Sequence, residues 1–299
     1  MESVVIDGVT LYLAHPDEVN LPFYGREDLI NQVLACWIVL DEKDIPLTPR
    51  LIGKPGVGKT TLAYAAAKRL KKDVYIFQAT VDTRPEDLIV TPVISEDKKI
   101  RYVASPIVTA MIKGGVAIID EANRMSEKSW ASLAPLLDAR RYVESIIAGV
   151  KIKAHPEFRL CVTMNEDAST FELPEYIQSR LQPQIFVDFP SYEEEKQILK
   201  ANLPWLEEGL LDYIVKFLQV AHDYGEPYSI RDGVNIGRYL LKKVKFLKNQ
   251  NLSVEDELSI LKEAIELILG TQALSYFNEF VVGKSPSSHP KGPFIYPVE

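Results

Sequence analysis

The chain has 299 residues, of which 46% are hydrophobic and 25% charged, a composition typical of globular proteins rather than disordered ones. It carries 34 basic and 42 acidic residues, and the net charge of −8 argues against tight, sequence-independent nucleic-acid binding as the main activity. No apolar run approaches the roughly 20 residues of a membrane span, and the first residues do not resemble a signal peptide. Both cysteines lie in apolar runs, as expected of buried thiols in a reducing compartment, so we expect a soluble, cytoplasmic protein without a membrane partner.

The first two thirds of the chain alternate between strand-like and helical patterns. Residues 1–20 contain short alternating segments that predict a small hairpin or an N-terminal arm, and apolar spacing predicts a helix over 26–40. The alternation that follows is typical of an α/β fold with a parallel sheet covered on both faces. The predicted strands are Arg50–Ile52, Val74–Phe77, Val116–Ile119, Phe158–Met164 and Ile185–Asp188, and the predicted helices include Thr60–Arg69 and Ser129–Leu137.

The pattern changes after Pro190, where helical periodicity dominates. We therefore place a domain boundary there, with an α/β core over 21–190 and a helical domain over 191–282. Helices are predicted over 192–203, 210–224, 231–248 and 254–269. Residues 283–299 are rich in Pro and Ser and predict an extended or disordered tail.

Two segments inside the core are expected to form hairpin inserts. Residues 91–105 have two β-like arms around a charged tip, and residues 141–154 have two such arms around Ala148 and Gly149. We expect the first hairpin to interrupt the second helix of the core and the second to precede the strand predicted over 158–164.

A glycine-rich segment predicts a phosphate-binding loop. It matches the pattern G-x-x-x-x-G-K-[ST] and lies between a predicted strand and a predicted helix, which is the context such a loop requires. Backbone N–H groups and the helix N-terminus would bind phosphate oxygens, Lys59 would reach the β- and γ-phosphates, and the Thr60 hydroxyl would bind Mg²⁺. The residues predicted to bind the nucleotide are Gly53, Lys54, Pro55, Gly56, Val57, Gly58, Lys59, Thr60 and Thr61.

Two acidic residues follow a strand of four apolar residues, Val116–Ile119. Asp120 is placed at the carboxyl end of that strand, where it would bind the same Mg²⁺, and Glu121 would polarise the attacking water. Downstream of a phosphate loop, this pair indicates a Mg²⁺-dependent nucleoside-triphosphate hydrolase.

These motifs resemble those of the AAA+ ATPases, and in particular the MoxR group, which includes CbbQ- and NorQ-type proteins and is related to the midasin and McrB modules. The resemblance extends from about Pro22 to Leu241. The segments that carry it are Tyr24–Glu27, Asp120–Met125, Thr163–Asn165, Leu173–Glu175 with Ser179–Leu181, and Ser229–Arg231. Ala122 stands where the group usually has Ile, and Ser179–Leu181 departs from the usual D-R-F.

The resemblance implies a fold, a substrate and an assembly. The fold would be an αβα P-loop core with a C-terminal helical lid, and the substrate ATP bound with Mg²⁺. Asn165 would act as sensor 1, Arg180 as an arginine finger supplied by a neighbouring subunit, and Arg231 as sensor 2. Arg140 and Arg141 are another possible pair acting from the neighbour. Sites shared between subunits require a homo-oligomeric ring, and the resemblance implies that this ring is a hexamer.

The resemblance also implies a role, and one alternative remains open. In the MoxR group, hairpin inserts face the ring axis and grip a protein client, and the resemblance implies action on metal-cofactor enzymes or with a von Willebrand A-domain partner. A remodelling or activating chaperone is therefore expected. The alternative is an NTP-driven subunit of a DNA-directed defence system like McrB, which uses GTP. The acidic net charge and the lack of an appended DNA-binding domain count against that alternative and make nucleic acid an unlikely partner. A non-catalytic nucleotide switch is disfavoured because the residues for hydrolysis are all present.

Overall fold

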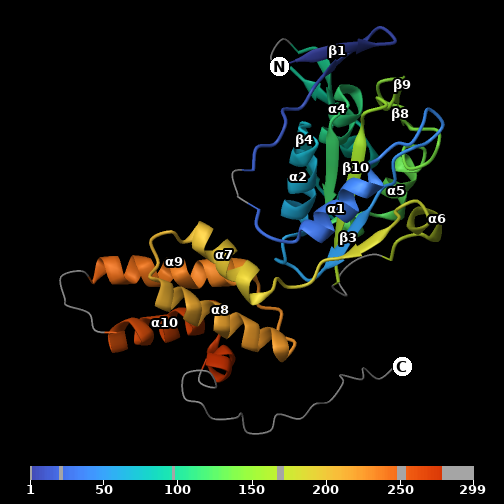
Figure 1. Cartoon of the computed structure of the whole chain (residues 1–299). Coiled ribbons are helices and arrows are strands. Elements are labelled where there is room, and N and C mark those ends of the chain that lie inside the picture. Colours follow the sequence, from blue (N-terminus) through green and yellow to red (C-terminus); the bar gives the residue numbers. More distant parts are fainter. Residues whose placement is uncertain (1, 20–22, 96–97, 167–171, 248–253, 278–299) are drawn as a thin grey trace, which may run out of the picture. The chain divides into compact units, whose positions relative to one another are not determined.

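The computed structural model describes residues 2–19, 23–95, 98–166, 172–247 and 254–277. The chain divides into two compact units, Met1–Asp188 and Phe189–Glu299, which are described separately (Figure 1). The boundary predicted near Pro190 lies close to this division. Among the helices in the described ranges, none has the length and apolar character needed to cross a bilayer.

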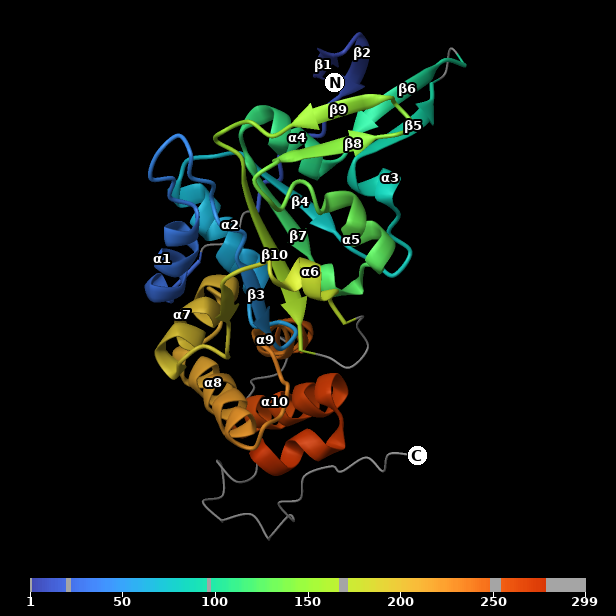
Figure 2. The same cartoon turned by 90° about the vertical axis from the view of Figure 1, so that its right-hand side faces the viewer.

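The first unit is built on a five-stranded parallel sheet, which confirms the predicted fold class (Figures 1 and 2). The central strands are buried along almost their whole length because helices cover both of their faces. In spatial order the strands are β11 (Gln184–Phe186), β3 (Arg50–Gly53), β10 (Arg159–Asn165), β7 (Val116–Asp120) and β4 (Val74–Gln78). The carboxyl ends of β3, β7 and β10 therefore lie side by side.

Helices pack on both sides of this sheet, with α1 and α2 on one side and α5 on the other (Figure 2). Serine residues cap α4 and α5, since Ser105 accepts a hydrogen bond from Val108 N and Ser126 from Ser129 N. The helices are α1 (Glu27–Cys36), α2 (Lys59–Arg69), α3 (Pro85–Leu88), α4 (Pro106–Lys113), α5 (Glu127–Leu133) and α6 (Glu175–Gln178), with a 3₁₀ turn η1 (Ala122–Arg124).

The helix predicted over 26–40 is shorter than expected and ends at Cys36. The next residue, Trp37, is buried, and its Nε1 donates to the carbonyl of Leu160 at 3.1 Å. Its own carbonyl accepts from Arg159 Nε at 2.7 Å. This anchoring to β10 turns the chain away from the helix axis, so residues 38–47 form a loop. The helix predicted over 129–137 corresponds to α5, but it begins earlier, after its Ser126 cap, and ends earlier, at Leu133.

Both predicted inserts form antiparallel hairpins, β5 (Val90–Ile94) with β6 (Ile100–Ala104) and β8 (Tyr142–Ser145) with β9 (Val150–Lys153). The first residues also form a hairpin, β1 (Ser3–Ile6) with β2 (Val9–Tyr12). That hairpin is not a free arm, because β2 pairs in parallel with β6 and completes a four-stranded sheet, β1-β2-β6-β5. Leu11 and Leu13 are buried there, which accounts for the docking.

The second unit is helical and has its own apolar core. Ser191 and Ser229 each form a capping box, with Glu194 and Asp232 respectively, and these boxes set the starts of two helices. The helices are α7 (Tyr192–Asn202), α8 (Glu208–Asp223), α9 (Ile230–Phe246) and α10 (Val254–Leu269), followed by the 3₁₀ turn η2 (Thr271–Ala273). The tail predicted over 283–299 lies outside the described residues.

Candidate nucleotide-binding site

The predicted phosphate loop connects β3 to α2. Gly56 and Gly58 have φ angles of 81° and 92°, a left-handed conformation that side-chain-bearing residues rarely adopt. At Gly53, a Cβ atom would lie 2.1 Å from the carbonyl oxygen of Val187, so only glycine fits beside the segment that follows β11. The loop conformation therefore depends on its glycines.

Lys59 is the first residue of α2, and its side chain folds back over the loop. It is 6% exposed, and its ammonium donates to the carbonyl oxygens of Gly53 and Lys54, both at 2.8 Å. A cation held over the loop by oxygen acceptors is placed to bind phosphate oxygens, which are acceptors of the same kind.

Asp120, at the end of β7, accepts hydrogen bonds from two hydroxyl groups. Thr60 of α2 donates to Oδ1 at 2.7 Å, and Thr163 of β10 donates to the same oxygen. The Thr163 hydroxyl also accepts from the backbone N–H of Glu121 at 3.2 Å. Three elements thus converge on one carboxylate. Thr163 was included in the sensor 1 segment of the sequence, but its bond to Asp120 was not predicted.

A carboxylate next to a threonine hydroxyl suits Mg²⁺, a hard cation that usually takes few protein oxygens and completes its shell with water and phosphate. Within the described ranges there is no cluster of three or more His, Cys, Asp or Glu residues able to hold a metal. The residues present therefore fit a metal that arrives with a nucleotide rather than a metal bound by protein groups alone.

Glu121 is the residue after β7 and has a left-handed φ of 52°. Its carboxylate is only partly exposed and lies 2.5 Å from Arg124 Nε. The chain therefore turns at Glu121, directly after Asp120. The ion pair with Arg124 was not predicted.

Asn165 ends β10 directly opposite Gly53 in the β10–β3 register. Its carbonyl oxygen accepts from Asn123 Nδ2 at 2.8 Å, and the next N–H, of Glu166, donates to Gly53 O at 3.3 Å. The structure thus brings Asn165 to the start of the phosphate loop, close to the predicted acidic pair.

Arg26 holds the phosphate loop from another direction. Its guanidinium donates to the carbonyl of Val57 at 3.1 Å and to the carbonyl of Asp188. The sequence placed Arg26 in a segment typical of the family but gave no contact for it. The sequence feature that could have indicated this contact is the position of Arg26 immediately before α1.

Three arginines are candidates for reaching the site of a neighbouring subunit, and their surroundings differ. Arg140 Nη2 lies 2.8 Å and Arg180 Nε 3.5 Å from the same oxygen of Asp138. The hydrogen bonds from Arg140, with the charge of Arg180, lower the pKa of Asp138 to about 2. Arg141 instead donates to Phe158 O at 3.0 Å, and burial lowers its pKa to about 10. Arg141 is thus held inside the unit, whereas Arg140 and Arg180 share one carboxylate.

Among the described residues, Arg180 makes no hydrogen bond or ion pair with the phosphate loop. Arg231 belongs to the second unit, where it is exposed and follows the first residue of α9. The roles of both arginines at the nucleotide remain predictions.

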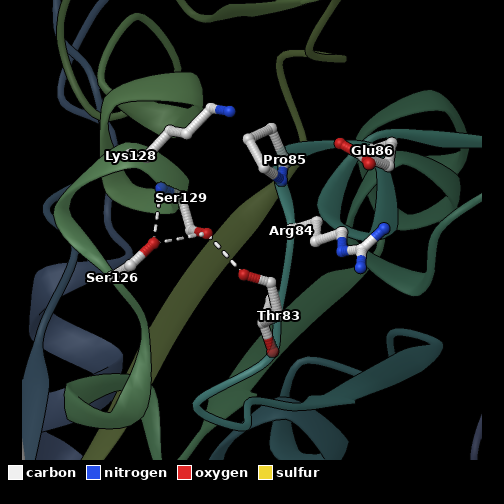
Figure 3. Close-up of a pocket in the computed structure, with 7 residues that line it drawn as sticks. All are labelled: Thr83, Arg84, Pro85, Glu86, Ser126, Lys128 and Ser129. Atoms are coloured by element: carbon white, nitrogen blue, oxygen red, sulfur yellow. Dashed lines mark hydrogen bonds between the residues drawn. The ribbon is translucent and has the colours of Figure 1, made fainter.

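A pocket of about 300 Å³ lies apart from these residues, between the starts of α3 and α5 (Figure 3). Ser129 joins its two sides, since its hydroxyl donates to Thr83 O at 2.6 Å and contacts Ser126 Oγ at 3.1 Å. The lining contains none of the predicted site residues. It consists of Thr83, Arg84, Pro85, Glu86, Ser126, Lys128 and Ser129.

Comparison with known proteins identifies a family that part of the first unit resembles. Residues 50–181 match the family described as AAA domain (dynein-related subfamily). An uncharacterized protein of Staphylococcus epidermidis is 29% identical over 172 residues, which cover 56% of this chain and 65% of that protein. The chain thus spans just under two thirds of that relative. An uncharacterized protein of Staphylococcus haemolyticus is 26% identical over 234 residues, covering 73% of this chain and 89% of the relative.

Solved structures show the same fold. The Holliday junction branch migration motor RuvB of Thermotoga maritima aligns with a TM-score of 0.54 at 19% identity, over 81% of this chain and 69% of RuvB. A variant of RuvB aligns with a TM-score of 0.56 at 19% identity, over 82% and 71% of the two chains. The chain therefore has the P-loop AAA+ fold, and its residues 50–181 are similar to the AAA domain of the dynein-related subfamily.

Proposed function

We propose that this chain is a Mg²⁺-dependent ATPase that works as a ring on a protein client, as the MoxR group does. The observation that carries the proposal is the convergence on Asp120. Hydroxyls from α2 and β10 bind one carboxylate oxygen beside a glycine loop, and Glu121 follows at the end of the same strand. This is the arrangement that phosphoryl transfer to water requires.

In the proposed reaction, the N–H groups of the loop and of the α2 N-terminus bind the phosphates, and Lys59 exchanges its carbonyl partners for β- and γ-phosphate oxygens. Thr60 and Asp120 would hold Mg²⁺, which neutralises charge on those oxygens when bound. Glu121 would accept the proton of the attacking water, and Asn165 would orient that water or the γ-phosphate. For this step the Glu121 carboxylate must leave Arg124, which lies 2.5 Å away.

The charge that develops on the γ-phosphate would be met by Arg180 of a neighbouring subunit and by Arg231 of a mobile helical lid. Arg180 is partly exposed and has Asp138 as its ion-pair partner at 3.5 Å, a separation at which exchange for phosphate costs little. Because such a site is complete only between subunits, a closed ring, expected to be a hexamer, would satisfy every site at once.

The hairpins support a polypeptide client. Their tips carry exposed isoleucines, Ile94 beside Ile100 in one and Ile146, 92% exposed, beside Ile147 in the other. Figure 2 shows both hairpins at the end of the unit from which β7 and β10 start. Exposed aliphatic side chains suit contact with an apolar polypeptide better than contact with a phosphate backbone, which favours the chaperone role over the McrB-like alternative. A von Willebrand A-domain partner remains an expectation from the resemblance.

Mixing two inactive variants tests the site and the ring together. Lys59→Ala should not bind nucleotide, and Arg180→Ala should bind it but hydrolyse it poorly. In a mixed ring, the intact Arg180 of a Lys59→Ala subunit serves the loaded site of its Arg180→Ala neighbour, so ATP turnover should partly recover.

The control mixture combines Lys59→Ala with Glu121→Gln, and it should stay inactive because every loaded site then lacks its base. Failure to recover in the first mixture, with mixed assembly shown by mass, would contradict the role of Arg180. Stimulation by DNA and not by an unfolded protein would favour the alternative function.

A further inference from the structure

The first surface of interest is the loop of residues 38–47, which we call the acidic loop. Leu47 N donates to Cys36 O at 2.8 Å and closes its ends. Inside it, Asp41 Oδ1 accepts from Lys43 N and Asp44 Oδ2 from Leu40 N, both at 2.8 Å. The loop is therefore a closed structure held by its own hydrogen bonds, of the kind that often carries function.

This loop exposes apolar side chains next to negative charge. Leu40 is 84% exposed, and four other large apolar side chains of the loop are exposed as well: Ile38, Val39, Ile45 and Leu47. The loop contains three carboxylates and one ammonium, for a net charge of 3 − 1 = 2 negative units. A cluster of exposed apolar side chains bordered by charge is typical of a protein interaction site.

The second surface is one face of α9, which we call the basic stripe. Its exposed residues recur at helical spacing and occupy an arc of about 80° over about 21 Å. The stripe consists of Arg231, Asn235, Arg238, Lys242 and Lys245, and Phe246, 86% exposed, borders its end.

The stripe carries four cationic side chains, those of Arg231, Arg238, Lys242 and Lys245. Within the part of the chain that the structure describes, none of the four side chains makes an ion pair or a hydrogen bond. Lys243, on the flank that faces α10, differs because it binds Glu263 at 2.5 Å. The stripe therefore presents unpaired positive charge next to an exposed aromatic ring, which suits a partner that is both anionic and apolar.

We propose that the acidic loop of one copy docks on the basic stripe of a second copy. The two surfaces are complementary in charge and in apolar character. The carboxylates of the loop would meet Arg238, Lys242 and Lys245, and Leu40 would meet Phe246. The chain itself thus carries the anionic, apolar partner that its stripe suits. A nucleic acid would use the cations but not the apolar side chains, and the net charge of −8 would repel it.

The contact joins two different surfaces, so it is heterologous and repeats from copy to copy until a ring closes. This inference rests on the ring of the proposed function and names a contact that would hold it together. It is separable from hydrolysis, because neither the acidic loop nor residues 238–245 were assigned a role at the nucleotide.

Charge reversal of each surface tests the contact. In the loop variant, Asp41→Asn/Glu42→Lys/Asp44→Asn, the asparagines keep the side-chain oxygens that accept backbone hydrogen bonds, while the loop charge changes from −2 to +2. In the stripe variant, Arg238→Glu/Lys242→Glu, Arg231 is left intact and Glu is as good a helix former as Lys. Circular dichroism and melting temperature check that each variant folds.

The measurement is the mass of the full-length protein against concentration, with ATP and Mg²⁺, by analytical ultracentrifugation. Each variant alone should need a protein concentration at least about 10-fold higher to assemble, because like charges then face each other. An equimolar mixture should assemble at the wild-type concentration, since the native loop of the stripe variant fits the native stripe of the loop variant, and the two reversed surfaces also fit. The control variant Lys153→Glu/Lys200→Glu changes the net charge by the same amount as the stripe variant and should assemble normally.

Three results would overturn the proposal. Unchanged assembly of both variants would show that this contact does not hold the ring together. If the mixture of Lys59→Ala and Arg180→Ala still recovered ATP turnover, the proposed ring would be retained and only this contact rejected. Restoration in a chain carrying both reversals, but not in the mixture, would place the contact within one copy. Normal assembly of the stripe variant with loss of binding to a fluorescent oligonucleotide would assign the stripe to nucleic acid.

Discussion

Replacing Thr163 by valine removes one hydroxyl from the centre of the candidate site at nearly constant volume. Thr163 is fully buried, its hydroxyl donates to the Asp120 carboxylate, and it accepts from Glu121 N at 3.2 Å. A hydrogen bond to a charged group contributes about 2 kcal/mol, and leaving the Glu121 N–H unpaired costs about 1 kcal/mol more. Thr163→Val should therefore lower the free energy of unfolding by about 3 kcal/mol.

The assay is urea unfolding of the nucleotide-free protein, followed by tryptophan fluorescence. At a slope of about 2 kcal/mol per molar urea, the midpoint should fall by about 1.5 M. Thr109→Val is the matched control, because Thr109 is equally buried and accepts from Ala14 N at 3.0 Å, whereas no carboxylate among the described residues bonds to its hydroxyl. It should lose about 1 kcal/mol, or about 0.5 M. Equal shifts for the two variants would refute the assigned importance of the bond to Asp120.

Three further predictions concern other parts of the first unit. Glu121→Gln should bind ATP normally and hydrolyse it at least about 100-fold more slowly, and unchanged turnover would mean that another group activates the water. Gly53→Ala should lower the free energy of unfolding in urea by about 2–3 kcal/mol, because the new Cβ would lie 2.1 Å from Val187 O. The control Gly209→Ala should not destabilise the protein, because its Cβ meets no atom within 4 Å. Similar urea midpoints for the two variants would contradict this prediction. The pKa of Asp138 is lowered from 3.8 to about 2 in the folded protein, so its stabilisation exists above pH 4 and is lost as the pH falls towards 2. The difference in melting temperature between the wild type and Asp138→Asn should therefore shrink below pH 4, and a constant difference would show that the charge of Asp138 is not involved.

Much of the candidate site could be predicted from the sequence because its parts are local. A glycine loop between a strand and a helix, and an acidic pair after an apolar strand, lie within a few residues of one another, and parallel strands bring their carboxyl ends to one edge. Asn165 was expected at this site from the family resemblance. The contacts of Thr163 with Asp120 and of Arg26 with Val57 could not be predicted, because they depend on side-chain directions between segments 43 and 31 residues apart.

By itself, the sequence determined the fold class, the chain order of the strands, and the helices α1, α2, α5 and α7 to α10, because buried strands and amphipathic helices have different periodicities. The helices α3, α4 and α6 were not predicted. Only the tertiary structure decided where helix α1 ends, since burial of Trp37 against β10 overrides the helical pattern that continues to residue 40. It also decided that the N-terminal hairpin pairs with β6, 91 residues away in the chain, and that Arg140 and Arg180 meet at Asp138 while Arg141 is buried. These pairings depend on how distant segments pack, and neither hydrophobic periodicity nor motif spacing records that information.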